Sequence, residues 1–225
     1  MSNLARRTVL GFAQLIVVMA IALFGPAWTL DYPQAWVYLL IFVGCAAIIT
    51  VYLGRNDPAL LERRIDAGPT AEKQPLQQLI QGVAAITFVG FLVVPALDHR
   101  FAWSQVPLAI EIAGDALVAL GFFIVYLVFK ENSFTAATIE VATGQKVIST
   151  GPYAIVRHPM YAGALVMLFG TPLALGSWWG LLLIIPMTLV LVLRLLDEER
   201  FLAKNLPGYT EYCQRVRYRL VPYIW

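Results

Sequence analysis

The chain has 225 residues, of which 60% are hydrophobic and 13% charged, and its formal net charge is +2. Soluble domains are about 45–50% apolar and about 25% charged, so this composition excludes an ordinary water-soluble domain as well as a disordered chain. The small net charge gives no indication of a nucleic-acid partner. Cys45 and Cys213 form neither a CxxC motif nor a metal-ligand spacing, so no metal site is expected.

Five apolar regions are long enough to meet a membrane. A helix needs about 20 apolar residues to cross the hydrocarbon core. Four stretches qualify as single spans: 8–30, 35–54, 76–97 and 107–130. The first could be taken for a signal peptide, but its apolar run continues past the candidate cleavage site, so an uncleaved anchor is expected.

The fifth apolar region, 160–196, is too long for one span. Trp178-Trp179 follow Gly176-Ser177 near its middle, which predicts a hairpin with legs at 160–176 and 180–196. We expect Gly163 and Gly170, which share one helical face, to let the two legs approach closely. The sequence therefore predicts one all-α integral-membrane domain, residues 1–225, with four transmembrane helices, a C-terminal helical hairpin and short amphipathic tail helices.

The basic residues predict an orientation. With the N-terminus in the cytoplasm and alternating spans, all of the 16 Lys and Arg residues except Arg100 fall on the cytoplasmic side. Both termini and the long polar segments are then cytoplasmic. We expect any chemistry, and any ligand pocket, to lie at that face. Glu111 and Asp115 fall toward the outer leaflet, where a structural role is expected.

Two polar segments have predictable local structure. Asp57 before Pro58 is typical of a helix start, and a short interfacial helix is expected over 59–65, ended by Gly68-Pro69. Residues 131–161 are expected to be extended backbone, bent at Thr143-Gly144 and Gly151-Pro152, with Pro159 as the first residue of the next helix. The N-terminus of that helix suits an anionic ligand group.

Arg194 is the strongest candidate functional residue on physical grounds. An arginine near the bilayer centre costs about 2.5–3.5 kcal/mol on insertion scales, so it marks a functional site by default. Glu198 lies four residues on, on the same helical face. The alternative is a plain Arg194–Glu198 ion pair. Glu199 points elsewhere and is expected to be solvated.

The tail carries a short amphipathic pattern. Tyr209, Tyr212 and Val216 recur at helical spacing after the Pro207-Gly208 break. The pattern predicts a short helix at headgroup level, and we expect its aromatic residues to serve packing.

Three motifs in the C-terminal half carry a family resemblance. GPYAIVRHPMYAG is followed about 35 residues later by RLLDEERFL and then by GYTEYCQRV. This combination resembles the isoprenylcysteine carboxyl methyltransferase family and the wider set of integral-membrane methyltransferases that includes phospholipid N-methyltransferases. It covers about residues 107–222, so the chain is expected to divide into N-terminal spans, 1–106, and a methyltransferase-like cofactor-binding half, 107–225.

The resemblance implies S-adenosylmethionine as the cofactor and assigns roles to individual residues. Arg194 is implied to face the substrate, and Glu198, the first glutamate of the EE pair, to bind the cofactor. The other residues implied to line the cofactor are Gln145, Lys146, Val147, Ile148, Tyr153, His158, Pro159 and Tyr161. An interface role for the aromatic residues and lipid-headgroup contacts for Arg157 are the plainer alternatives.

The implied chemistry fits these residues. Methyl transfer from a sulfonium is an in-line displacement, so the protein mainly aligns two reactants. An acceptor carboxylate is already ionised at pH 7 and needs no general base, and an arginine can hold it with two hydrogen bonds. The expected reaction is carboxyl O-methylation of an isoprenylcysteine-like, lipophilic or lipidated acceptor.

The sequence is also compatible with other acceptors and other functions. The acceptor could be a small thiol, a phospholipid amine or an isoprenoid acid. The fold also resembles part of membrane sterol reductases, so a nicotinamide-dependent membrane reductase is an alternative. Outside enzymes, a non-catalytic membrane organiser or small transporter would tolerate Glu198→Gln.

Overall fold

The fold is seen in a computed structural model that describes residues 3–65, 72, 74–135 and 137–225. Its α-helices are α1 (Asn3–Ala27), α2 (Pro33–Asn56), α3 (Pro58–Ile65), α4 (Pro75–Phe101), α5 (Leu108–Glu131), α6 (Pro159–Ala174), α7 (Ile184–Asn205) and α8 (Tyr209–Arg215). Short 3-10 helices, η2 (Gly151–Ala154) and η3 (Trp179–Leu183), precede α6 and α7. No strand occurs within the described ranges.

Within the described residues, five helical stretches are long and apolar enough to cross a bilayer: α1, α2, α4, α5 and the continuous run of η3 and α7. The expected hairpin is present, with its turn at 175–178, but its legs are unequal. The first leg, α6, has 16 residues, about 24 Å, whereas the second has 27 residues, about 40 Å. The prediction ended the second leg at 196, where the apolar pattern stops. The helix continues because its polar last turns have partners in the rest of the molecule.

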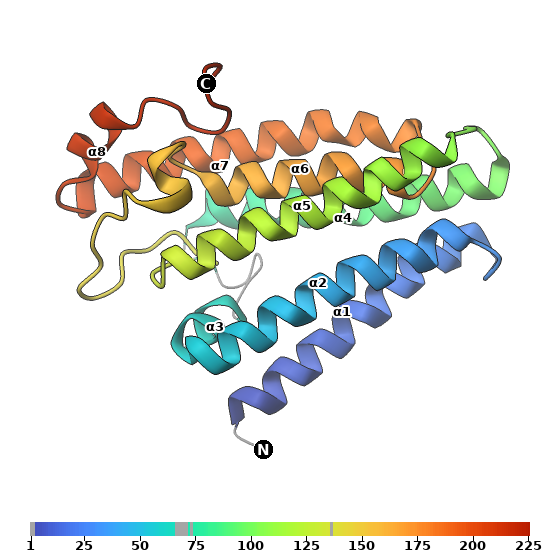
Figure 1. The fold of residues 1–225 in the computed structure, drawn as a ribbon, viewed down its shortest axis with the longest axis horizontal. Coiled ribbons are helices and arrows are strands. Elements are labelled where there is room, and N and C mark those ends of the chain that lie inside the picture. The colour runs from blue at the N-terminus through green and yellow to red at the C-terminus, as the bar shows by residue number, and fades with distance from the viewer. Residues whose placement is uncertain (1–2, 66–71, 73, 136) are drawn as a thin grey trace.

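The helices run between two ends of an elongated bundle (Figure 1). The connections α1–α2, α4–α5 and α6–α7 lie at one end, on the right of the view. The start of α1, the α3 helix, the segment between α5 and α6, and α8 lie at the other. All of the long polar segments therefore meet at one end, as the alternating topology predicts.

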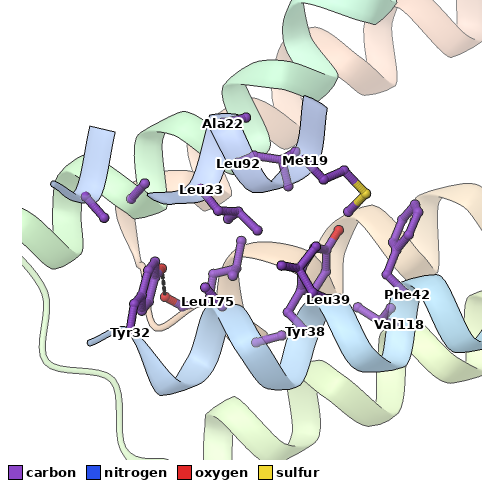
Figure 2. Close-up of a cluster of buried hydrophobic side chains, with 14 residues drawn as sticks. Met19, Ala22, Leu23, Tyr32, Tyr38, Leu39, Phe42, Leu92, Val118 and Leu175 are labelled. Atoms are coloured by element: carbon purple, nitrogen blue, oxygen red, sulfur yellow. Dashed lines mark hydrogen bonds between the residues drawn. The ribbon is translucent and has the colours of Figure 1, made fainter. Parts of the chain in front are cut away.

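The core sits between the N-terminal helices and the rest of the bundle. Figure 2 shows its buried side chains, among them Met19 and Leu23 of α1, Phe42 of α2 and Val118 of α5. A buried hydrogen bond from the Tyr32 hydroxyl to the Leu175 carbonyl oxygen (2.6 Å) ties the start of α2 to the hairpin turn. Many apolar side chains on the outer helix faces are exposed, as expected for helices surrounded by lipid.

The close helix contact made by Gly163 and Gly170 is with α5, so the prediction that they join the hairpin legs was wrong. A Cβ at Gly121 of α5 would lie 2.6 Å from the Gly163 carbonyl oxygen, and one at Gly170 would lie 2.6 Å from the Gly114 carbonyl oxygen. Gly114 and Gly121 have the same seven-residue spacing as the α6 pair. Backbones can touch only where both helices lack side chains, which selects α5 over α7 as the partner.

Several local predictions are confirmed. Pro58 begins α3, and the Asp57 carboxylate accepts a hydrogen bond from the Leu60 backbone N–H (2.9 Å). The tail helix α8 follows Gly208, whose φ of 84° requires a residue without a side chain. The expected end of the α3 helix at Gly68-Pro69, and Lys73, lie outside the described residues.

Candidate active site

A hollow opens at the polar end of the bundle, among the start of α6, the end of α7, α8 and the segment 132–158. It encloses about 890 Å³ of space outside the protein atoms, including the part open to solvent. It is lined by every residue to which the resemblance assigns a role: Gln145, Lys146, Val147, Ile148, Tyr153, His158, Pro159, Tyr161, Arg194 and Glu198. Residues spread over more than fifty positions of the chain thus surround one space.

The local backbone explains how the segment before α6 reaches the hollow. Gly151 has a φ of 56°, a conformation that disfavours side chains, and it starts the turn η2. His158 is the N-cap of α6 and Pro159 is its first residue, as predicted. Proline lacks the N–H that would be unpaired at a helix start, and it disfavours helical geometry for the residue before it. His158 and Pro159 are therefore held at the wall of the hollow.

Tyr161 links the two residues proposed from α7. Its hydroxyl donates to Glu198 Oε2 (2.6 Å) and accepts a hydrogen bond from Arg194 Nε (3.2 Å). A hydroxyl that accepts a hydrogen bond from a guanidinium becomes a better hydrogen-bond donor. The two linked hydrogen bonds therefore fix the orientation of the Glu198 carboxylate. The second oxygen of Glu198 has no hydrogen bond among the described residues.

Arg194 is held by groups from both halves of the molecule. It is 7% exposed, and its Nη1 lies 2.7 Å from Glu72 Oε1 and donates to Gln77 Oε1 (2.9 Å). Its Nη2 donates to the Ala137 carbonyl oxygen (2.8 Å). Within the described part of the chain, the ion-pair partner of Arg194 is thus Glu72. The alternative of a direct pair with Glu198 was wrong.

Glu199 is the centre of a second polar cluster, so the expectation that it is solvated was wrong. Its Oε1 lies 3.1 Å from Arg157 Nη1 and 3.3 Å from His158 Nε2, and its Oε2 accepts from Arg219 Nε (2.9 Å). Two backbone hydrogen bonds connect the same segments, because the N–H groups of 157 and 158 donate to the carbonyl oxygens of Tyr218 and Arg219 (2.9 Å each). Glu199 therefore fastens the C-terminal tail to the start of α6.

Tyr153 and Tyr212 build the wall formed by η2 and α8. The Tyr212 hydroxyl donates to the Tyr153 carbonyl oxygen (2.8 Å), and the Tyr153 hydroxyl accepts from Asn132 Nδ2 (3.0 Å). Burial raises the pKa of Tyr153 to about 12. Its hydroxyl is therefore neutral at physiological pH and keeps a proton that it can donate into the hollow.

Sequence reasoning missed the contribution of the N-terminal half to this end of the molecule. The Arg64 guanidinium of α3 lies over the ring of Phe129 (5.3 Å to the centroid) and interacts electrostatically with Tyr161 and Glu198. Burial lowers the pKa of Arg64. Glu72 and Gln77 meet Arg194. No local motif marks these residues, because their position depends on how α3 and α4 pack.

The structure thus describes an all-helical protein with several apolar, membrane-length helices and a polar ligand-sized hollow at one end. Residues 110–207 match the model of the phospholipid methyltransferase family. Over 91 residues the chain is also 36% identical to the delta(14)-sterol reductase TM7SF2 of Mus musculus. That stretch is 39% of this chain and 22% of the reductase, so the match spans about a fifth of the relative.

Proposed function

We propose that this protein is an integral-membrane methyltransferase that uses S-adenosylmethionine to methylate a lipophilic acceptor. The observation that carries the proposal is the convergence of ten residues, assigned from the resemblance to membrane methyltransferases, on one hollow. The family match over residues 110–207 includes all ten. Neither motif alone would predict that the two sequence regions meet.

The residues of the hollow suit S-adenosylmethionine. Its methionyl end carries an ammonium, a carboxylate and a positive sulfonium. The hollow offers the Lys146 ammonium and the Glu198 carboxylate, one oxygen of which has no hydrogen bond to the described part of the chain. The adenine ring of its nucleoside end has flat apolar faces, and Val147, Ile148 and Leu206 supply an apolar surface. When bound, the cofactor would supply an electrophilic methyl group.

The protein's own part in the reaction is alignment and charge. Glu198, oriented by Tyr161, would accept hydrogen bonds from the cofactor and offset its positive charge. The Arg194 guanidinium donates a hydrogen bond to Tyr161, and Arg194 is one turn nearer than Glu198 to the apolar part of α7, from which a lipophilic acceptor would arrive. These residues would hold the acceptor in line with the sulfonium, so that the methyl group would pass from sulfur to the acceptor and leave S-adenosylhomocysteine (SAH).

For the acceptor we propose the carboxylate of an isoprenylcysteine-like molecule, held by Arg194. A carboxylate needs no base to react. Because Glu72 already contacts Nη1 at 2.7 Å, the acceptor's carboxylate would take the place of the Glu72 carboxylate on the guanidinium. The expected product is then a methyl ester. A thiol acceptor would instead give a thioether, and an amine acceptor a methylated amine.

A nicotinamide-dependent reductase is the second candidate, favoured by the 36% identity to the sterol reductase over 91 residues. The two candidates differ in the nucleotide that binds. SAH should raise the melting temperature of the detergent-solubilised full chain, and NADPH should leave it unchanged. The reverse result would replace the methyltransferase proposal with the reductase.

The acceptor can be identified directly. The solubilised protein is incubated with methyl-labelled S-adenosylmethionine and a membrane extract, and the labelled lipid-phase product is analysed. A base-labile methyl ester supports the proposed acceptor. A base-stable label points to a thioether or a methylated amine instead. The Glu198→Gln variant serves as the control. If the protein is not catalytic, the wild type and the variant will give the same background of labelled product.

We further propose that the hollow faces the cytoplasm, because all Lys and Arg residues but Arg100 belong to that side of the alternating topology. Reporter fusions after Trp225 test this orientation. Activity of a cytoplasmic reporter is expected, and activity of an exported reporter alone would reverse it.

A further inference from the structure

The tail helix α8 forms one wall of the hollow but lies beyond residue 207, where the family match ends. Tyr209 is its first residue and is 5% exposed. Its side chain belongs to a buried cluster with Leu206, Tyr212 and Val216, against which Val147 packs. The sequence predicted only a packing role for this aromatic residue.

The hydroxyl of Tyr209 has no hydrogen-bond partner among the described residues, although it is buried. Its neighbours differ in this respect, because the hydroxyls of Tyr212 and Tyr153 are both bonded within the protein. An unbonded buried hydroxyl costs stability, and native structures rarely keep one without a reason. Since Tyr209 also lines the hollow, a ligand there can supply the missing partner.

The charge state of Tyr209 suits this role. Burial, together with the nearby Cys213, Glu199 and Glu198, raises the pKa of Tyr209 well above its usual value. The group is therefore a neutral hydroxyl at physiological pH. It can donate one hydrogen bond and accept another.

We propose that α8 is the nucleoside-facing wall of the ligand site and that the Tyr209 hydroxyl hydrogen-bonds the polar edge of the bound nucleoside. This inference rests on the proposed function. A flat heteroaromatic base combines apolar faces with a polar edge, and the α8 wall combines an apolar cluster with one available hydroxyl. Glu198 and Lys146 would bind the charged methionyl end of the ligand.

The test compares two isosteric substitutions on the same helix. Tyr209→Phe removes only the unbonded hydroxyl, so the melting temperature of the ligand-free protein should be unchanged or higher. Its affinity for SAH, measured by isothermal titration of the full chain in detergent, should fall about 2- to 12-fold, the range for one neutral hydrogen bond. Tyr212→Phe removes an internal bond, so it should lower the melting temperature of the ligand-free protein.

The outcomes separate this inference from the proposed function. No SAH binding by the wild-type chain overturns both. Wild-type binding with unchanged affinity in Tyr209→Phe overturns the inference alone, as does a drop in ligand-free melting temperature equal to that of Tyr212→Phe. The rise in melting temperature on adding SAH provides a second measure of affinity. A smaller rise for Tyr209→Phe than for the wild type supports the inference.

Discussion

The last turn of α4 lies at the end of the bundle remote from the helices that line the hollow (Figure 1). Asp98, in this turn, is 1% exposed and is surrounded by donors. Its two oxygens accept from the Ser104 backbone N–H (2.7 Å), the Ser104 hydroxyl (2.6 Å) and the Ser177 hydroxyl (2.5 Å). At the other end, Glu198 accepts one hydrogen bond among the residues that the structure describes, from Tyr161, and lines an open space. A carboxylate whose oxygens are both bonded within the protein stabilises the fold, whereas one with a free oxygen can bind a ligand.

The largest effect on stability is expected from Asp98→Ala. The substitution leaves the buried Ser177 hydroxyl, the partly buried Ser104 hydroxyl and the Ser104 N–H without their acceptor, which should lower the free energy of unfolding by about 3 kcal/mol. Unfolding in detergent by added sodium dodecyl sulfate measures this change. Asp31→Ala, an exposed position at the same end, is the control. A loss of SAH affinity in Asp98→Ala at temperatures where it stays folded would contradict the separation of the two ends.

The largest effect on cofactor binding is expected from Glu198→Gln. Loss of a charged hydrogen-bond partner in a partly buried site costs about 1.5–3 kcal/mol, so the dissociation constant for SAH should rise about 10- to 150-fold. The melting temperature of the ligand-free protein should change little, because the amide oxygen can still accept from Tyr161. Glu211→Gln, exposed on α8, is the control. If the dissociation constant for SAH were the same in Glu198→Gln and the wild type, Glu198 would not bind the cofactor.

Arg194→Lys should separate turnover from cofactor binding. A lysine ammonium cannot replace the planar guanidinium that contacts Glu72, Gln77 and Tyr161 at once. We expect turnover to fall about tenfold, equivalent to about 1.4 kcal/mol, with a much smaller change in SAH affinity. Arg200→Lys, exposed on the same helix, is the control. An equal loss of affinity and turnover would mean that Arg194 acts only by orienting Tyr161 and Glu198.

The smallest effect is expected from Glu199→Gln. Its carboxylate holds Arg157 and Arg219, and the Arg219 side chain is 30% exposed, so solvent weakens that pair. The stability should fall by about 1 kcal/mol, and the tail after 215 should become more sensitive to protease. If the tail stays as resistant as in the wild type, Glu199 does not fasten it, and the backbone bonds at 157 and 158 suffice.

Local features of this fold follow from the sequence because their causes are local. Proline at the first position fixes the starts of α3 and α6 at residues 58 and 159, and the Asp57 carboxylate caps α3. Apolar length fixes the four long spans to within a few residues. The end of the second hairpin leg was misplaced, because apolar length alone cannot show that a polar helix end will find partners.

The sequence by itself determined the membrane-length helices, the alternating topology and the segments that contain the proposed site. Only the tertiary structure decided which charges pair: Arg194 pairs with Glu72, and Glu199 pairs with Arg219 of the tail. It also decided which helix backbones touch, as Gly163 of α6 and Gly121 of α5 do. Periodicity and composition act over a few residues, whereas these contacts depend on how separate helices pack. The one buried hydroxyl on α8 that is left for a ligand becomes visible only when the partners of its neighbours are known.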